Sequence, residues 1–219
     1  MTLNLRRSIL TAAACLVLVM PVHAALSVSF NGSVVRVSGV TPRGQVALIS
    51  VMREANAKMI TRLNDTQQLL TDSDGDGAVE YDFKKDVPIR SVWAVVDVDS
   101  GSSLITAPGE FPTSESLLPA GFVKNAPADE FDTLIGEHML LHVLWVHPGR
   151  GGSGVWFMRS ADGGANDKDG KTNGRAVLST ASFLPLGDSG KAPKKLKKGD
   201  VLVLLDPFAM SSSRGVISQ

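Results

Sequence analysis

The chain has 219 residues, a single cysteine, and 22 basic against 22 acidic residues, so its formal net charge is zero. This balance excludes the broad positive field with which many nucleic-acid-binding proteins attract a phosphate backbone. The length is enough for one large or two small domains, each with its own hydrophobic core.

Residues 1–24 have the pattern of a secretory signal peptide. Arg6 and Arg7 form a positive n-region, an apolar run covers residues 9–20, and Ala24 is a small residue suited to cleavage after it. The apolar run is shorter than the roughly 20 residues that a membrane-spanning helix needs. The pattern therefore predicts an exported bacterial protein, periplasmic or secreted, with no membrane span in its mature form.

Cys15 lies inside this segment, so the mature chain is predicted to have no thiol and no disulfide. Residues 12–15 resemble a lipidation signal only in part, because Leu is missing from its usual place, and lipidation of Cys15 stays open. Without disulfides, the stability of the exported protein comes from its hydrophobic core, to which bound ions can add.

Residues 25–107 have the pattern of a compact all-β unit. Short apolar or alternating segments are separated by turn signals such as Asn31-Gly32. The predicted strands cover residues 26–30, 34–40, 45–52, 58–63, 67–70, 78–83 and 90–98. Seven short strands at this spacing predict an immunoglobulin-like β-sandwich, with Trp93 as a core aromatic between its two sheets. A short helix at residues 53–63 is the alternative to one of these strands.

An acidic turn opens one of the predicted strands. Five carboxylates lie within eleven residues, with no Lys or Arg among them: Asp72, Asp74, Asp76, Glu80 and Asp82. Like charges at this range repel one another unless a cation or water screens them. With Gly77 at the sixth position, the spacing of the first three resembles the first half of an EF-hand calcium loop.

Two interpretations of the acidic turn stay open. An EF-hand needs a bidentate Glu at position 12, which is Phe83 here, and Glu80 at position 9 is the nearest substitute. The turn is therefore either a weak calcium site or a metal-free hairpin turn, in which Gly accepts positive φ and Asp bonds to its own backbone. The alternation of residues 78–83 predicts a strand after the loop, where an EF-hand has a helix.

The composition changes between residues 108 and 130, where Pro- and Gly-containing segments predict a connector with little regular structure. Residues 131–219 return to a β pattern and predict a second β-rich unit. Its predicted strands cover residues 139–146, 155–159, 175–180 and 201–205, and the residues after Asp206 are predicted to fray.

A polar loop at residues 160–174 echoes the first acidic turn. Asp167 and Asp169, with Asn173, offer oxygen ligands for a second calcium ion. Lys168 and Lys171 neutralise part of the loop and weaken this interpretation. Farther along, five lysines between residues 191 and 198 predict a solvated loop.

The histidines do not form a zinc pattern. In a strand, His138 and His142 share one face while His147 lies on the other, so the three do not converge without a bend. Ser153 lies in a glycine-rich turn, but Val155 stands where a nucleophile elbow needs Gly.

Three aromatic residues of the predicted second unit are assigned to core packing, with a sugar-stacking surface as the alternative: Trp145, Trp156 and Phe157.

The sequence favours an exported, non-catalytic binding or structural β-module, with stabilisation by calcium at its acidic loops left open. Its partner would be an extracellular or periplasmic protein or a glycan. The alternative is a hydrolase acting on an envelope polymer or carbohydrate, for which the sequence names no catalytic residue.

Overall fold

The computed structural model describes residues 25–52, 66–110, 118, 122–125, 129–134, 140–147 and 154–218. These residues form fifteen β-strands and one short 3₁₀ helix, Thr180–Ser182, which confirms the mainly β class. No helix in this part of the chain has the length and hydrophobicity that crossing a bilayer requires. The predicted signal peptide and the predicted strand at residues 58–63 lie outside the described residues.

The N-terminal half forms two antiparallel sheets, with strand orders β1-β2-β5 and β4-β3-β6-β7. The strands are β1 Ser27–Asn31, β2 Val34–Ser38, β3 Gln45–Met52, β4 Thr66–Thr71, β5 Ala78–Asp82, β6 Ser91–Asp97 and β7 Ser103–Thr106. The predicted turn after Asn31 is present: Asn31 pairs with Val34, and Gly32 between them has a φ of 58°. Glycine adopts this left-handed conformation at little cost because it has no Cβ.

The C-terminal half forms a six-stranded sheet, β13-β11-β10-β14-β15-β8, and a two-stranded sheet, β12-β9. The strands are β8 Phe122–Asn125, β9 Glu130–Leu134, β10 Leu140–His147, β11 Gly154–Ala161, β12 Arg175–Ser179, β13 Leu184–Pro185, β14 Val201–Asp206 and β15 Ser211–Ser218. β8 pairs with β15 in parallel, and the other described pairs of this half are antiparallel.

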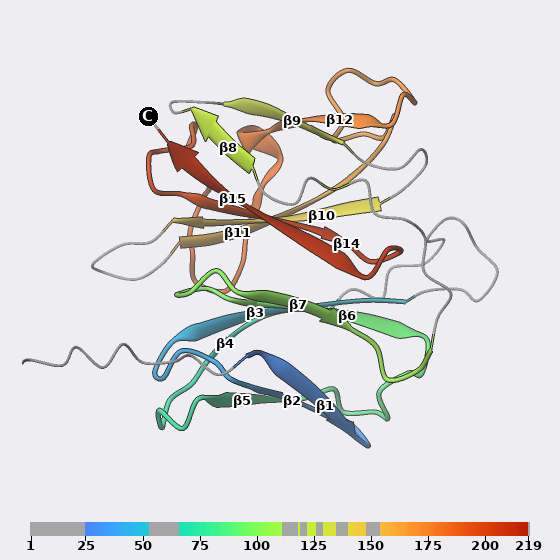
Figure 1. Cartoon of the computed structure of the whole chain (residues 1–219), viewed down its shortest axis with the longest axis vertical. Helices are drawn as coiled ribbons and strands as arrows, with labels where there is room; N and C mark the ends of the chain where they lie inside the picture. The colour runs from blue at the N-terminus through green and yellow to red at the C-terminus, as the bar shows by residue number, and fades with distance from the viewer. Residues whose placement is uncertain are drawn as a thin grey trace, which may run out of the picture.

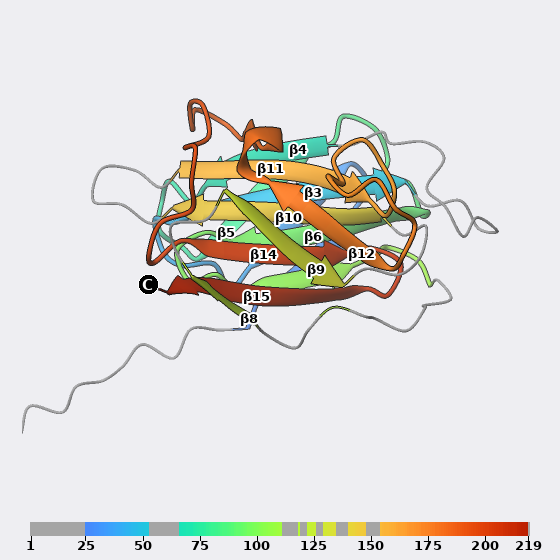
Figure 2. The same cartoon turned by 90° about the horizontal axis from the view of Figure 1, so that it is seen from above.

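The four sheets stack as layers (Figure 1), and apolar side chains fill the spaces between them. Val35 and Trp93 pack between the two N-terminal sheets. Ile49 and Leu144 belong to the cluster between β4-β3-β6-β7 and the six-stranded sheet. Leu178 belongs to the outer cluster under β9 and β12, two strands that run obliquely across the six-stranded sheet (Figure 2).

The two middle layers are buried on both faces, which explains the strongest apolar signals in the sequence. Every residue of β6 is buried, because one face of this strand meets the β1-β2-β5 sheet and the other meets the six-stranded sheet. A strand covered on both sides is a continuous apolar run without alternation. Trp93, which is 0% exposed, is the core aromatic between two sheets that the sequence predicts.

The two halves contribute strands to separate sheets but share one apolar layer. No described sheet mixes strands from residues 27–106 with strands from residues 122–218. The cluster around Ile49 nevertheless joins side chains of both halves, and the Ser103 and Ser212 hydroxyls lie 2.8 Å apart across the same boundary. That residues 25–107 form a domain of their own stays a prediction. Strand β8 and the start of β9 lie within residues 108–130, the predicted connector.

The prediction that the chain frays after Asp206 is wrong. Residues 211–218 form β15, an interior strand between β14 and β8. Its first three residues are serines, which carry no apolar signal, although Ser213 and Ile217 are both buried. Hydrogen bonds to two neighbouring strands hold this segment, and composition alone does not show them.

We expect Ile49→Ala to lower the free energy of unfolding by about 2–5 kcal/mol, because it leaves a cavity in the layer that both halves share. Urea unfolding followed by circular dichroism and by tryptophan fluorescence should show one transition that shifts as a whole. Ile89→Ala is the matched control, since Ile89 is 70% exposed and its truncation should change stability by less than about 0.5 kcal/mol. Two transitions, of which only one shifts, would show that the layer does not couple the halves.

Candidate metal centre

The acidic loop connects β4, in one N-terminal sheet, to β5 in the other. Gly75 and Gly77 have φ angles of 82° and 77°, so the chain turns through two left-handed positions within three residues. Glycine is the residue that takes these angles without strain. The loop therefore folds back on itself between the ends of the two strands.

Asp72 anchors this loop from the inside. Its side chain is 1% exposed. Oδ1 accepts the N–H of Gly75 at 2.9 Å, and Oδ2 accepts the N–H groups of Gly77 at 3.0 Å and Arg43 at 3.1 Å. Burial raises the pKa of Asp72, but the three backbone donors outweigh it and hold the pKa below its usual value. The ionised carboxylate thus organises the loop.

Asp74 and Asp76 lie on the exposed side of the same loop. Asp74 Oδ1 accepts the N–H of Asp76 at 3.2 Å, and Asp76 Oδ1 accepts the N–H of Ala78 at 2.8 Å. One carboxylate oxygen from each of Asp72, Asp74 and Asp76 lies within 4.8 Å of the other two. The structure therefore brings the three predicted ligands together, as the EF-hand-like spacing indicates.

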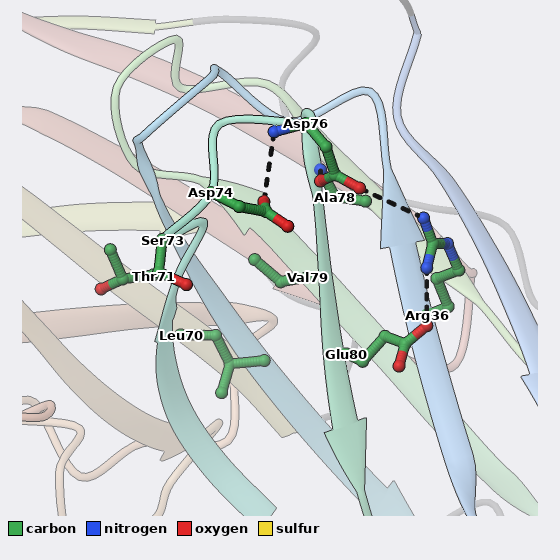
Figure 3. Close-up of a pocket in the computed structure, with 9 residues that line it drawn as sticks. All are labelled: Arg36, Leu70, Thr71, Ser73, Asp74, Asp76, Ala78, Val79 and Glu80. Atoms are coloured by element: carbon green, nitrogen blue, oxygen red, sulfur yellow. Dashed lines mark hydrogen bonds and ion pairs between the residues drawn. The ribbon is translucent and has the colours of Figure 1, made fainter.

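Arg36 supplies a cation that sequence reasoning missed. It lies on β2 directly opposite Glu80 on β5, and its Nη1 is 2.6 Å from Glu80 Oε1. Its Nη2 is 3.6 Å from Asp76 Oδ2 (Figure 3). The hydrogen bond to Glu80 raises the pKa of Arg36 above its ordinary value. Glu80 is thus held in an ion pair, outside the group of three aspartates. From the sequence, Arg36 could be placed beside Glu80 only by predicting the register of β2 and β5, two strands that are distant in sequence.

The fifth carboxylate of the acidic stretch is also paired. Asp82 Oδ2 lies 2.6 Å from Lys84 Nζ, and its Oδ1 accepts the Lys84 N–H at 2.8 Å. These bonds lower the pKa of Asp82 to about 2. Of the five carboxylates, Asp72, Asp74 and Asp76 thus remain as a group. A polar hollow of about 370 Å³ lies beside them, and Asp74, Asp76 and Arg36 help to line it (Figure 3).

The second acidic loop is closed by its own carboxylates. Asp167 is buried and accepts the N–H groups of Gly163 and Val177, each at 2.9 Å. Asp169 accepts the N–H of Lys171 at 2.9 Å, and this bond lowers its pKa. Within the described ranges, the aspartates of the first loop are the one group of three acidic or histidine side chains at metal-binding separation. Asp167 and Asp169 lack such a third ligand there.

His142 and His147 lie on opposite faces of β10, as predicted, and do not converge. His142 is 1% exposed and meets the Phe157 ring edge-on at 5.4 Å between centroids. Burial, with a smaller effect of Arg159, lowers the pKa of His142 to about 3, so the ring is neutral at pH 7. His147 Nδ1 is hydrogen-bonded to the buried carboxylate of Asp200. His138 and Ser153 lie outside the described residues.

The predicted core aromatics are confirmed as core residues. Trp145 and Trp156 pair across β10 and β11, with ring centroids 4.8 Å apart, and are 0% and 4% exposed. Phe157 is 2% exposed and packs in the layer between the two halves. Rings this deeply buried offer no face on which a sugar could stack.

No model of a known protein family matches the chain, and no curated protein matches it in sequence. The geometry of the acidic loop is therefore the basis for functional inference. Three carboxylates of one loop, of which Asp72 is buried while Asp74 and Asp76 are exposed, can hold a hard cation through oxygen atoms.

We expect Asp72→Asn to lower the melting temperature at pH 7, because an amide has one acceptor oxygen for three backbone N–H groups. The folded-state pKa of Asp72 is depressed, so its stabilisation is present above the unfolded pKa of about 3.9 and is lost as the pH falls through the folded value. The difference in melting temperature between wild type and variant should therefore narrow below about pH 4. A difference that stays constant from pH 7 to pH 3 would contradict this role for the carboxylate.

Proposed function

We propose that this protein is a non-catalytic binding or structural β-module that is stabilised by calcium at Asp72, Asp74 and Asp76. The observation that carries the proposal is the convergence of one oxygen from each carboxylate within 4.8 Å. Calcium takes six to eight oxygen ligands at 2.3–2.6 Å and accepts irregular geometry, so water can complete an exposed site. The carbonyl of Ala78, at the seventh loop position, is the backbone ligand that the spacing assigns.

The choice of calcium follows from the ligand chemistry. The loop offers carboxylate oxygens without a histidine or cysteine, which disfavours zinc. Magnesium demands near-ideal octahedral geometry and gives up its water reluctantly, whereas a half-exposed loop suits the larger ion. Position 12 of the loop is Phe83 and Glu80 is paired with Arg36, so the loop itself supplies no bidentate carboxylate. We therefore assign a dissociation constant of roughly 10⁻⁴ to 10⁻³ M, the range of extracellular modules.

The proposed setting is the bacterial periplasm or the medium, on the basis of the signal-peptide pattern at residues 1–24.

We also propose that the N-terminal half is an immunoglobulin-like sandwich. Its support is a three-stranded and a four-stranded antiparallel sheet that face each other, with Trp93 buried between them. The partner that we propose is a protein or glycan of the same compartment.

The hydrolase alternative has no specific observation in its favour in the described part of the chain. His142 is buried in the core, and each carboxylate of the acidic loop accepts a backbone N–H group. These contacts suit a loop that holds a shape better than a site that exchanges protons with a substrate.

Calcium at 10 mM should stabilise the protein by about 1.4–2.7 kcal/mol relative to chelator. An ion that binds only the folded state shifts the unfolding equilibrium by mass action, and 10 mM is about 10–100 times the assigned dissociation constant. The measurement is the melting temperature in calcium and in chelator. The double variant Asp74→Asn with Asp76→Asn should lose this response.

The matched control is Asp86→Asn with Asp188→Asn, which removes the same charge from exposed positions outside the loop. This control should keep the full calcium response. Equal melting temperatures of the wild type in calcium and chelator would show that the loop is a metal-free turn. A response that persists in the Asp74 and Asp76 variant would place the ion elsewhere, with Asp167 and Asp169 as the next candidates.

A further inference from the structure

The lysine-rich segment between β13 and β14 is anchored to the C-terminal core. All its lysines are exposed: Lys191, Lys194, Lys195, Lys197 and Lys198. Leu196 among them is 0% exposed and packs in the outer apolar cluster. Trp156 Nε1 donates to the Gly190 carbonyl at 2.9 Å, and Thr180 Oγ1 donates to the Lys194 carbonyl at 2.7 Å. The backbone of this segment is therefore anchored to the core, while its lysine side chains are exposed.

Among the described residues, these lysines differ from Lys84 and Lys168 in having no ion-pair partner. Lys84 and Lys168 each form an ion pair, with Asp82 and Glu130 respectively. Among the residues whose placement is described, none of the lysines between 191 and 198 has a carboxylate within ion-pair distance. Five positive charges lie within eight residues of this anchored segment, and a bound anion would relieve their mutual repulsion.

A hollow of about 360 Å³ lies where this segment meets the 3₁₀ helix and the start of β9. Lys191 and Lys194 line it, together with the ion-paired residues Lys168 and Glu130. The lining also includes carboxylate, hydroxyl and apolar groups from Asp129, Ser179, Thr180, Ala181, Phe183, Ala192 and Pro193. The lining thus holds three lysines against two carboxylates, a net charge of +1, and Lys191 and Lys194 are its lysines without an ion pair among the described residues.

The mixed lining selects among anionic ligands. A nucleic acid or another polymer with a charge on every unit would meet the carboxylates of Asp129 and Glu130, which repel it. A small ligand with a single anionic group can place that group at Lys191 and Lys194 alone. The remaining carboxylates accept hydrogen bonds and so suit a ligand that carries several hydroxyl donors. The volume is at the lower end of the range for small-molecule sites.

We propose that this hollow binds a sugar acid. The ligand carboxylate lies between Lys191 and Lys194, its hydroxyl groups donate to Asp129 and Glu130, and its C–H face packs against Ala192 and Pro193. This assignment does not depend on the calcium proposal, because the hollow is built entirely from residues of the C-terminal half.

The test uses D-glucuronate as the probe and D-glucose as its neutral counterpart. Titration of the purified, ¹⁵N-labelled protein with glucuronate should give saturable amide shifts at Ala181 and Ala192, and glucose should give none at the same concentrations. Lys191→Met with Lys194→Met should weaken glucuronate binding at least tenfold. The matched control, Lys195→Met with Lys198→Met, removes the same charge from the same segment outside the hollow and should stay within twofold of wild type.

Three results would overturn the proposal: no saturable shift with glucuronate, equal shifts with glucose, or equal loss of binding in both double variants. The last result would mean that diffuse positive charge, and not the hollow, attracts the anion. Both lysines of the test pair are exposed, so the variant should keep the wild-type melting temperature. The single variant Lys191→Gln should also weaken glucuronate binding, by a smaller factor than the double variant.

Discussion

Buried aspartates that accept N–H groups hold the loops of this protein in place. Among the described residues, six aspartates are no more than 6% exposed: Asp72, Asp97, Asp162, Asp167, Asp200 and Asp206. Each accepts at least two N–H groups, as Asp162 does from Asn173 and Gly174, both at 3.1 Å. A carboxylate has about four lone-pair sites, so one side chain can fix several loop residues. The described residues contain no cysteine, so no disulfide does this work there.

This constraint changes how the acidic loop is understood. The sequence suggests five like charges that need a cation, but the fold already screens most of them. Backbone donors surround Asp72, Lys84 pairs with Asp82, and Arg36 reaches Glu80 and Asp76 from a neighbouring strand. Calcium at this loop would therefore add stability to a turn that is already formed, which agrees with weak binding.

The strands and loops that have a distinct pattern in their own residues were predicted correctly. Residues 45–52 match β3 at both ends, and the spacing of Asp72, Asp74 and Asp76 located the acidic cluster. Non-local features were missed. The serine-rich β15 is held by partners on both sides, and Arg36 reaches the loop through strand register. The apolar run of β6 indicated burial, but it did not indicate that the C-terminal half covers one of its faces.

Amide hydrogen exchange in the presence of chelator tests the role of the aspartates most directly. The N–H groups of Gly75, Gly77, Gly163 and Gly174 lie in loops, yet each is donated to a buried aspartate. If carboxylates hold the loops, these amides should exchange slowly, at rates close to those of the neighbouring strands, with no metal present. Exchange at the rate of an unstructured peptide would contradict the account, because the loops would then lack the bonds that define them.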